Sequence, residues 1–271
     1  MSADQIAAID VHAHYGVYDR RETTALENQF MTGDAAVVVG RARQAHTALT
    51  IVSPLLGLFP RGGADAVAGN EEAAEVVPRF PELRWWVIVH PLQPQTYEQA
   101  RRFLATPQCV GIKIHPEEHQ YPIAEHGTAL FAFAAAQGAV VMAHSGDPLS
   151  APAAYVPFAD AFPAVQVILA HLGNGGAAGN HPDLQVKAIQ ASRQGNVYTD
   201  TSSARSLMPG LIEWAVGQVG AEKILYGTDT PLYFAPSQRA RIDAAQLSEA
   251  DKRLILCDNA RRLLGAKVAA A

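Results

Sequence analysis

Short runs of apolar residues, rich in Val, Ile and Leu, recur along the chain and predict buried β-strands. Buried parallel strands are continuous hydrophobic runs in sequence because both of their faces are covered. Eight such runs stand at positions 7–11, 49–52, 85–89, 110–114, 139–142, 165–169, 196–198 and 223–226.

Segments that are compatible with helices separate these runs. They lie at 34–48, 70–79, 96–104, 128–137, 181–193 and 206–219, and one or two closing helices are expected within 248–265. Polar residues that serve as N-caps stand at five of these starts: Asp34, Asn70, Thr128, Ser206 and Ser248.

The alternation of strands and helices predicts an α/β fold, a (β/α)8 TIM barrel that forms a single domain over residues 1–271. The usual size of such a barrel, about 250 residues, fits the chain. An open doubly wound sheet is the alternative. That fold more often carries a glycine-rich phosphate loop after its first strand, whereas the first strand here ends in histidines.

Histidines and one aspartate mark the ends of several predicted strands. His12 and His14 stand two residues apart and therefore share one face of the first strand. His144, His171 and Asp229 follow the fifth, sixth and eighth strands. Catalytic side chains of such barrels lie at the carboxyl ends of the strands. Imidazoles with one carboxylate suit Zn²⁺ or a similar divalent ion, so these residues predict a metal centre.

Motifs in a fixed order connect these positions: IDVHAH, GNEEAAEVVPRFPEL, GIKIHP, MAHSG, LAHLG, YTDTS, ILYGTDTPL and NARRLLG. Together they resemble the amidohydrolase superfamily of metal-dependent barrels, in particular the branch that includes the aminocarboxymuconate semialdehyde decarboxylases. The resemblance implies that His12, His14, His144 and Asp229 hold one divalent metal ion, most often Zn²⁺, with Mn²⁺ as the alternative. It also implies that His171 faces the metal-bound water. Asp10 is assigned to the support of these ligands, deeper in the barrel.

Lys113 and His115 end the fourth strand. In two-metal relatives a lysine of this strand is carbamylated and bridges the ions, but many relatives of this branch use one metal, and we do not expect a second. We assign Lys113 a substrate-binding or supporting role. His115 and Arg205 complete the predicted substrate-binding residues, and Arg61 is a further candidate partner for a substrate carboxylate.

Two reactions suit these residues. The first is hydrolysis of a C–N or C–O bond, in an amide or lactone of a small carbonyl or carboxylate compound, by a metal-activated water. Asp229 would transfer the proton and His171 would stabilise the developing oxyanion. The alternative is non-oxidative decarboxylation of a small unsaturated or aromatic acid at the same centre. A metal-binding protein without catalytic activity is a third reading.

The charge pattern narrows the class of partner. The formal net charge is −5, and no run of Lys and Arg is longer than a doublet, which argues against nucleic acid or an anionic membrane as a partner. We expect a small-molecule substrate, and a homo-oligomer is left open. Two distant cysteines and the lack of a signal peptide favour reduced thiols and a cytoplasmic enzyme.

Overall fold

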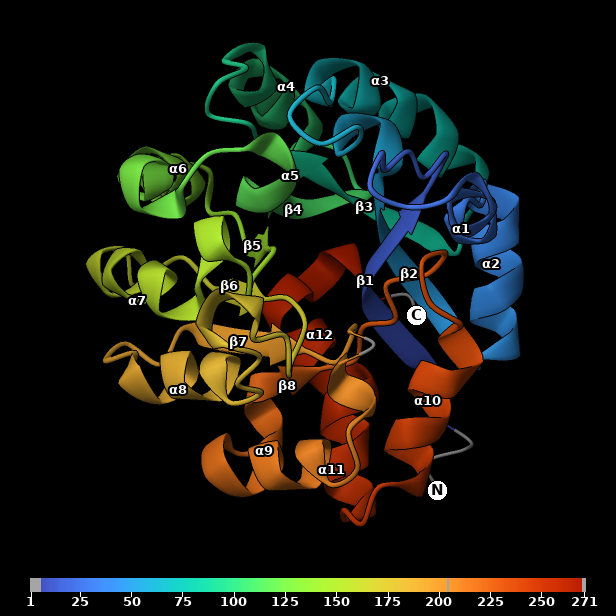
Figure 1. Ribbon diagram of the computed structural model, residues 1–271, viewed down its shortest axis with the longest axis vertical. Helices are drawn as coiled ribbons and strands as arrows, with labels where there is room; N and C mark the ends of the chain where they lie inside the picture. The colour runs from blue at the N-terminus through green and yellow to red at the C-terminus, as the bar shows by residue number, and fades with distance from the viewer. Residues whose placement is uncertain (1–5, 204, 270–271) are drawn as a thin grey trace.

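The computed structural model describes residues 6–203 and 205–269. Of Arg205 it describes only the backbone. Eight parallel strands pair in chain order, each with the next, and helices alternate with them, so the predicted (β/α)8 barrel is confirmed (Figure 1). The strands are β1 (Ala8–Tyr15), β2 (Thr47–Pro54), β3 (Leu83–Ile88), β4 (Cys109–Ile114), β5 (Val141–Ala143), β6 (Val167–Leu169), β7 (Val197–Asp200) and β8 (Ile224–Leu225).

The segment that follows β8 closes the barrel against β1. The N–H of Val11 donates to the carbonyl oxygen of Tyr226 (2.9 Å), and the N–H of Asp229 donates to that of His12 (2.7 Å). Asp10 lies deeper on β1, where its Oδ1 accepts from the N–H groups of His12 (3.0 Å) and Thr228 (3.1 Å). The first and last strands therefore meet at the residues that were predicted to be functional.

Alternate residues of β5 and β6 enter two different hydrophobic clusters. On β5, Val141 and Ala143 pack in a cluster with residues of helices that lie between β1 and β7, whereas Met142 packs in a second cluster that includes residues of helices that follow β6. Trp86 of β3 belongs to this second cluster, and its indole N–H donates to the carbonyl oxygen of Val11 on β1 (2.9 Å). This alternation follows from the two-residue repeat of a strand and fills both the barrel interior and its outer layer.

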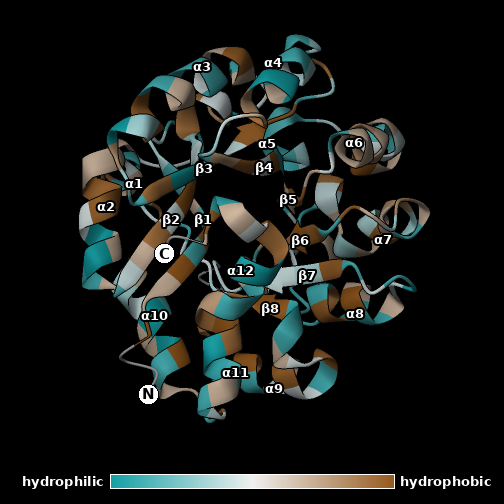
Figure 2. Cartoon of the chain, turned by 180° about the vertical axis from the view of Figure 1, so that it is seen from behind, coloured by the Kyte–Doolittle hydropathy of each residue, from teal (hydrophilic) through white to brown (hydrophobic). Residues whose placement is uncertain are grey.

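Helices surround the barrel (Figure 1). Seen from behind, in Figure 2, α12 crosses the centre of the barrel, and hydrophobic and hydrophilic residues alternate along the ribbons. The α-helices are α1 (Ala25–Met31), α2 (Ala35–Gln44), α3 (Ala66–Val76), α4 (Gln95–Phe103), α5 (Pro116–His119), α6 (Ile123–Gln137), α7 (Pro152–Ala161), α8 (Leu184–Ala191), α9 (Leu211–Val219), α10 (Ala235–Ala244), α11 (Glu249–Arg253) and α12 (Asn259–Leu264).

Two of the predicted N-caps are confirmed and a third is wrong. Asp34 caps α2 by accepting from Val37, and Ser248 caps α11. Asn70 does not begin a helix, because Asp65 caps α3 one turn earlier. Asn70 instead lies buried within α3 and bonds the backbone of β3.

The predictions for Thr128 and Ser206 are also wrong. Thr128 lies inside α6, which begins earlier, after Pro122. Ser206 lies in a 3₁₀ turn before α9, and its hydroxyl donates to the carbonyl oxygen of Thr201 (2.8 Å); Gly210 stands at the N-cap of α9. A polar residue near a helix start predicts a cap only when no tertiary partner competes for its side chain.

Both cysteines are free and buried, as the sequence predicts. Burial raises the pKa of the Cys109 thiol to about 12, which makes it inert at neutral pH. Within residues 6–203 and 205–269, every helix is too short or too polar to cross a membrane.

Candidate active site

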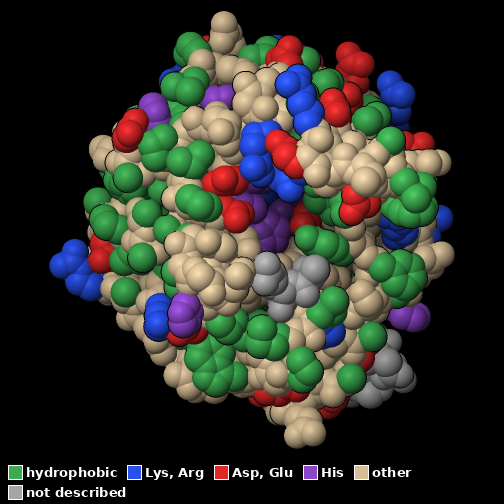
Figure 3. Space-filling model, in the orientation of Figure 1, with side chains coloured by type: hydrophobic (Ala, Val, Ile, Leu, Met, Phe, Trp, Pro, Cys, Tyr) green, Lys and Arg blue, Asp and Glu red, His purple; other side chains and the backbone are tan. Residues whose placement is uncertain are grey.

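A cavity of about 240 Å³ opens at the carboxyl ends of the strands. Five of the predicted site residues line it: His14, His115, His144, His171 and Asp229. Figure 3 shows histidine at the bottom of the central hollow, with acidic and basic side chains at its rim. The position agrees with the location of active sites in such barrels.

Three of the four predicted metal ligands converge beside this cavity. One ligand atom each of His12, His14 and Asp229 lie within 4.8 Å of one another, and all three residues are buried. The Oδ1 of Asp229 is 3.0 Å from Nε2 of His14 and 3.8 Å from Nε2 of His12.

The outer nitrogens of both imidazoles are already engaged. Nδ1 of His12 lies 2.9 Å from Oδ2 of Asp200, and Nδ1 of His14 lies 3.2 Å from the carbonyl oxygen of Ser53. These oxygens accept, so each Nδ1 carries the proton and each Nε2 is left as an acceptor near Asp229, whose Oδ1 has no hydrogen-bond partner. Acceptor atoms facing each other in a buried space are the arrangement that a divalent cation satisfies, so these residues fit the implied metal.

Ionisation of Asp229 agrees with such a role. Burial opposes the charge, but the neighbouring imidazoles of His14, His12 and His171 outweigh it and lower the pKa of Asp229 to about 2. The residue therefore carries a negative charge at neutral pH.

Lys113 is the cation nearest to these groups among the contacts described. It is fully buried on β4, and its Nζ donates to Nε2 of His12 at 2.9 Å. Burial lowers the pKa of Lys113 to about 8, although the charges of Asp229 and Asp200 oppose this shift. The structure thus places Lys113 against a candidate ligand, and its contact with a substrate stays a prediction.

His144 is directed differently from the other three predicted ligands. Its Nε2 donates to Oδ2 of Asp147 (2.7 Å), and its Nδ1 accepts from Nε2 of His171 (3.2 Å). Burial disfavours the charge of Asp147, but its bond with His144 outweighs this and lowers the pKa of Asp147 to about 2. His144 lines the cavity, but it is not one of the three converging ligands, so its role as a metal ligand stays a prediction.

Asp200 is a central residue that the sequence analysis did not single out. Besides His12, it binds the backbone N–H of His171 (3.1 Å) and both the N–H and the hydroxyl of Ser202. His12, His171 and Asp200 form a second group whose atoms lie within 4.8 Å of one another. Asp200 stands at the end of β7, and this position at a strand end could have identified it as a site residue, as it did for His144 after β5.

Both predicted catalytic residues have left-handed backbone conformations. The φ angles are +72° at His171 and +58° at Asp229, a region that residues with a side chain rarely adopt. Such conformations persist only where surrounding contacts hold them, and they concentrate at functional sites. Burial lowers the pKa of His171 well below its usual range, so its ring is neutral.

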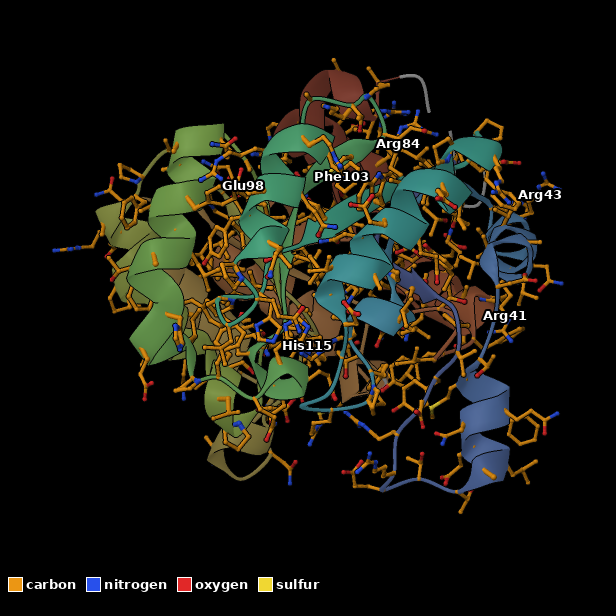
Figure 4. The ribbon with its side chains drawn as sticks, turned by 90° about the horizontal axis from the view of Figure 1, so that it is seen from above. Arg41, Arg43, Arg84, Glu98, Phe103 and His115 are labelled. Carbon is orange, nitrogen blue, oxygen red and sulfur yellow. The ribbon has the colours of Figure 1, made fainter. Side chains whose placement is uncertain are left out.

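His115 presents a fixed hydrogen-bond donor to the cavity. Its Nδ1 accepts from the N–H of Glu118 in α5 (3.2 Å), which places the proton of the neutral ring on Nε2. The ring stacks on His144, with centroids 4.0 Å apart, and burial keeps the pKa of His115 well below its usual range. Figure 4 shows His115 towards the centre of the molecule, whereas Arg43 lies at its edge.

The two predicted arginines have different outcomes. The side chain of Arg205 lies outside the described residues, so its role stays a prediction. Arg61 binds Glu118 through Nε (3.1 Å) and Nη2 (2.8 Å) and is not among the residues that line the cavity.

A match to a family model identifies the family of this chain. The model described as amidohydrolase matches residues 9–266, which is nearly the whole chain. The chain belongs to the amidohydrolase family. This confirms the resemblance that the motifs carry, and the converging ligands lie within the matched segment.

Solved structures of amidohydrolase-superfamily decarboxylases share the fold. A 2,6-dihydroxybenzoate decarboxylase from Rhizobium superimposes with a TM-score of 0.75 at 14% identity, covering 97% of this chain and 99% of the other. A dihydroxybenzoic acid decarboxylase from Polaromonas sp. JS666, with bound manganese and 2-nitroresorcinol, superimposes with a TM-score of 0.74 at 16% sequence identity. The match covers 100% of this chain and 99% of the other. The 5-carboxyvanillate decarboxylase from Sphingomonas paucimobilis superimposes with a TM-score of 0.69 at 16% sequence identity, and the match covers 95% of this chain and 98% of the other. No curated protein matches the sequence.

Proposed function

We propose that this member of the amidohydrolase family is a metal-dependent, non-oxidative decarboxylase of a small unsaturated or aromatic acid. The observation that carries the proposal is the convergence of Nε2 of His12, Nε2 of His14 and Oδ1 of Asp229 beside a cavity that could admit such an acid. The reaction class is supported by the three structural neighbours described above, each of which is named as a decarboxylase.

One divalent ion completes the proposed site. His12, His14 and Asp229 would hold it, together with His144 after that ring turns from Asp147. When bound, the ion supplies positive charge that attracts the substrate's oxygen atoms and stabilises negative charge that develops on them. Zn²⁺ and Mn²⁺ both suit imidazole and carboxylate ligands, and the manganese in the Polaromonas neighbour supports Mn²⁺ as the first ion to test.

The residues of the chain then divide the chemistry. Decarboxylation requires a proton on the carbon that bears the carboxyl group; the C–C bond then breaks, its electron pair returns to the unsaturated system, and CO₂ leaves. We assign the proton transfer to Asp229, because its carboxylate borders both the converging ligands and the cavity. The ionised carboxylate first accepts a proton from solvent and then delivers it to this carbon, so that it is a carboxylate again when CO₂ leaves. We assign orientation of the acid to the neutral rings of His171 and His115, which can donate hydrogen bonds without adding charge.

Metal content and product analysis test this assignment together. The protein is loaded with Mn²⁺ or Zn²⁺, its metal content is measured by plasma mass spectrometry, and release of CO₂ is followed with aromatic and unsaturated acids. Lactones and amides are tested in parallel. Metal-dependent release of CO₂ supports the proposal. Hydrolysis of a lactone or amide without any release of CO₂ overturns it in favour of a hydrolase, and one bound metal without turnover of either panel points to a binding protein.

The remaining expectations belong to the same proposal. A small molecule is the expected partner, neither nucleic acid nor membrane is expected to bind, and the enzyme is expected in the cytoplasm, with a homo-oligomer left open. The net charge of −5 and the buried, polar cavity support a small-molecule substrate.

A further inference from the structure

Two arginines share one buried carboxylate at the rim of the cavity. We call Arg20, Arg61 and Glu118 the rim triad. The side chain of Glu118 is only 2% exposed, and Arg61 holds both of its oxygens through two nitrogens. Arg20 binds through Nη2 to Oε1, an oxygen that Arg61 already contacts. The triad therefore carries one positive charge more than its carboxylate neutralises.

Arg20, and not Arg61, is the arginine with unused hydrogen-bonding capacity. Arg61 engages Glu118 as a fork, the preferred geometry of a guanidinium with a carboxylate. Arg20 has a single-point contact, and its Nε is buried without a hydrogen-bond partner. Arg20 lines the cavity, whereas Arg61 is absent from the residues lining it. The surplus positive charge is thus presented to the cavity by Arg20.

Aromatic rings hold the Arg20 guanidinium in place. Its central carbon lies 5.7 Å from the ring centroid of Phe59 and 6.0 Å from that of Tyr18, and the two rings are 4.7 Å apart. Both rings also line the cavity. The lining of the cavity thus combines histidines, the two aromatic rings and the cation of Arg20, a set that suits a planar anionic ligand.

We propose that Arg20 recognises a second anionic group of the substrate, other than the group that faces His14 and Asp229. This inference rests on the proposed function and narrows its substrate class to a small planar acid that carries a further carboxylate or ionised hydroxyl group. Arg20 is then a specificity-determining residue, and Glu118 is the residue that positions it.

Binding of inert anions to the Mn²⁺-loaded protein tests the inference without turnover. The probes are benzoate, with one carboxylate, and benzene-1,3- and benzene-1,4-dicarboxylate, with two; affinities are measured by titration calorimetry. We expect at least one dicarboxylate to bind the unmodified protein roughly ten- to a hundred-fold more tightly than benzoate, the range of a charge-assisted hydrogen bond. The substitution Arg20→Gln should remove most of this preference and leave the affinity for benzoate unchanged.

Matched variants separate recognition from folding and from overall charge. Arg20→Gln leaves the bidentate pair of Arg61 and Glu118 intact, so we expect the variant to fold. Arg21→Gln makes the same change of charge at the adjacent, exposed position and should keep the full preference. Arg20→Lys keeps the charge and should keep part of it. A preference for dicarboxylate that is equal in Arg20→Gln and Arg21→Gln overturns the inference.

Failure of the inference is distinguishable from failure of the proposed reaction. If acids lose CO₂ but Arg20→Gln binds all probes as the unmodified protein does, the reaction stands and the role of Arg20 is wrong. If the preference depends on Arg20 but no acid loses CO₂, the recognition site stands and the reaction is wrong. For any acid that is turned over, Arg20→Gln should raise KM about ten-fold or more with little change in kcat.

Discussion

Nδ1 of His12 lies 2.9 Å from Oδ2 of Asp200, so the carboxylate fixes the imidazole with its other nitrogen turned towards the candidate metal centre. Replacing Asp200 with Asn removes the charge while it keeps the shape. We expect metal affinity to fall by roughly ten- to a hundred-fold, the usual effect of losing a partner that orients a ligand. Competition with a chromogenic chelator measures this affinity.

Asp183 offers a control for this change. It stands before α8 on the surface, where its carboxylate pairs with Lys187, and Asp183→Asn should leave metal affinity unchanged. Equal metal retention by Asp200→Asn and Asp183→Asn would contradict the assigned role of Asp200.

Asp229→Asn should abolish turnover while the fold survives. The pKa of Asp229 is lowered to about 2, so the native side chain is charged at neutral pH, whereas the amide can neither accept the proton in transit nor balance a cation. We expect kcat to fall by roughly 10²- to 10⁴-fold, the contribution of a positioned acid–base group. Release of CO₂ measures turnover, and circular dichroism checks the fold.

The exposed Asp19, in the loop that follows β1, supplies the comparison for Asp229. Asp19→Asn removes a carboxylate from the same end of the barrel and should retain full activity. An Asp229→Asn protein as active as Asp19→Asn would show that the proton transfer has been assigned to the wrong residue.

The strands were the most predictable part of the fold, because burial on both faces leaves a continuous apolar run for each of them. The first strand was nonetheless predicted too short. β1 extends to Tyr15 and contains His12 and His14, both of them buried. Polar residues such as these would ordinarily mark the end of a buried strand. Helix starts were less predictable, because the side chains of Asn70 and Ser206 make tertiary contacts, with Ile88 and Arg241, that a local pattern does not contain.

Functional groups at strand ends were predictable, but the groups that hold them were not. His14, His171 and Asp229 could be located because the end of a parallel strand is a defined place in a barrel. Arg20 and Glu118 could not, because Arg20 lies in a loop and Glu118 in the short helix α5, and the path of both segments depends on packing. Their pairing joins positions 98 residues apart, which no local pattern shows.

Gly111 of β4 is required for packing inside the barrel. A Cβ at this position would lie 2.5 Å from the carbonyl oxygen of Val140 and 2.7 Å from the ring of Trp86. We expect Gly111→Ala to lower the free energy of unfolding by about 1–3 kcal/mol, the usual cost of overpacking a core. Urea denaturation measures it.

Gly217, inside α9, provides the opposite case, because nothing lies within 4 Å of a Cβ added there. Gly217→Ala should raise the free energy of unfolding by about 0.5–1 kcal/mol, since alanine favours the helix. If both substitutions shift the urea midpoint in the same direction, the packing argument for Gly111 fails.

His119 should make the fold sensitive to acid. Burial, with the charge of the stacked His90, lowers the pKa of His119 from its ordinary value of 6.5 to about 3. Between these values the unfolded chain binds the extra proton and the folded chain does not, so stability is lost as the pH falls from about 6.5 towards 3. The loss from this residue reaches about 2 kcal/mol at pH 5.

Urea midpoints measured at pH 7 and pH 5 test this dependence. His119→Gln should show a smaller loss between the two pH values than the unmodified protein, even if the variant is less stable at both. His181→Gln, at an exposed position, should reproduce the unmodified difference. An undiminished loss in His119→Gln would rule out His119 as its source.

The bond between the N–H of Asp229 and the carbonyl oxygen of His12 joins the two ends of the barrel at the candidate metal centre. During synthesis on the ribosome, His12 emerges more than two hundred residues before Asp229. A nascent chain therefore lacks a complete set of ligands until its final strand has been added, and loading with metal becomes a late event, coupled to completion of the fold.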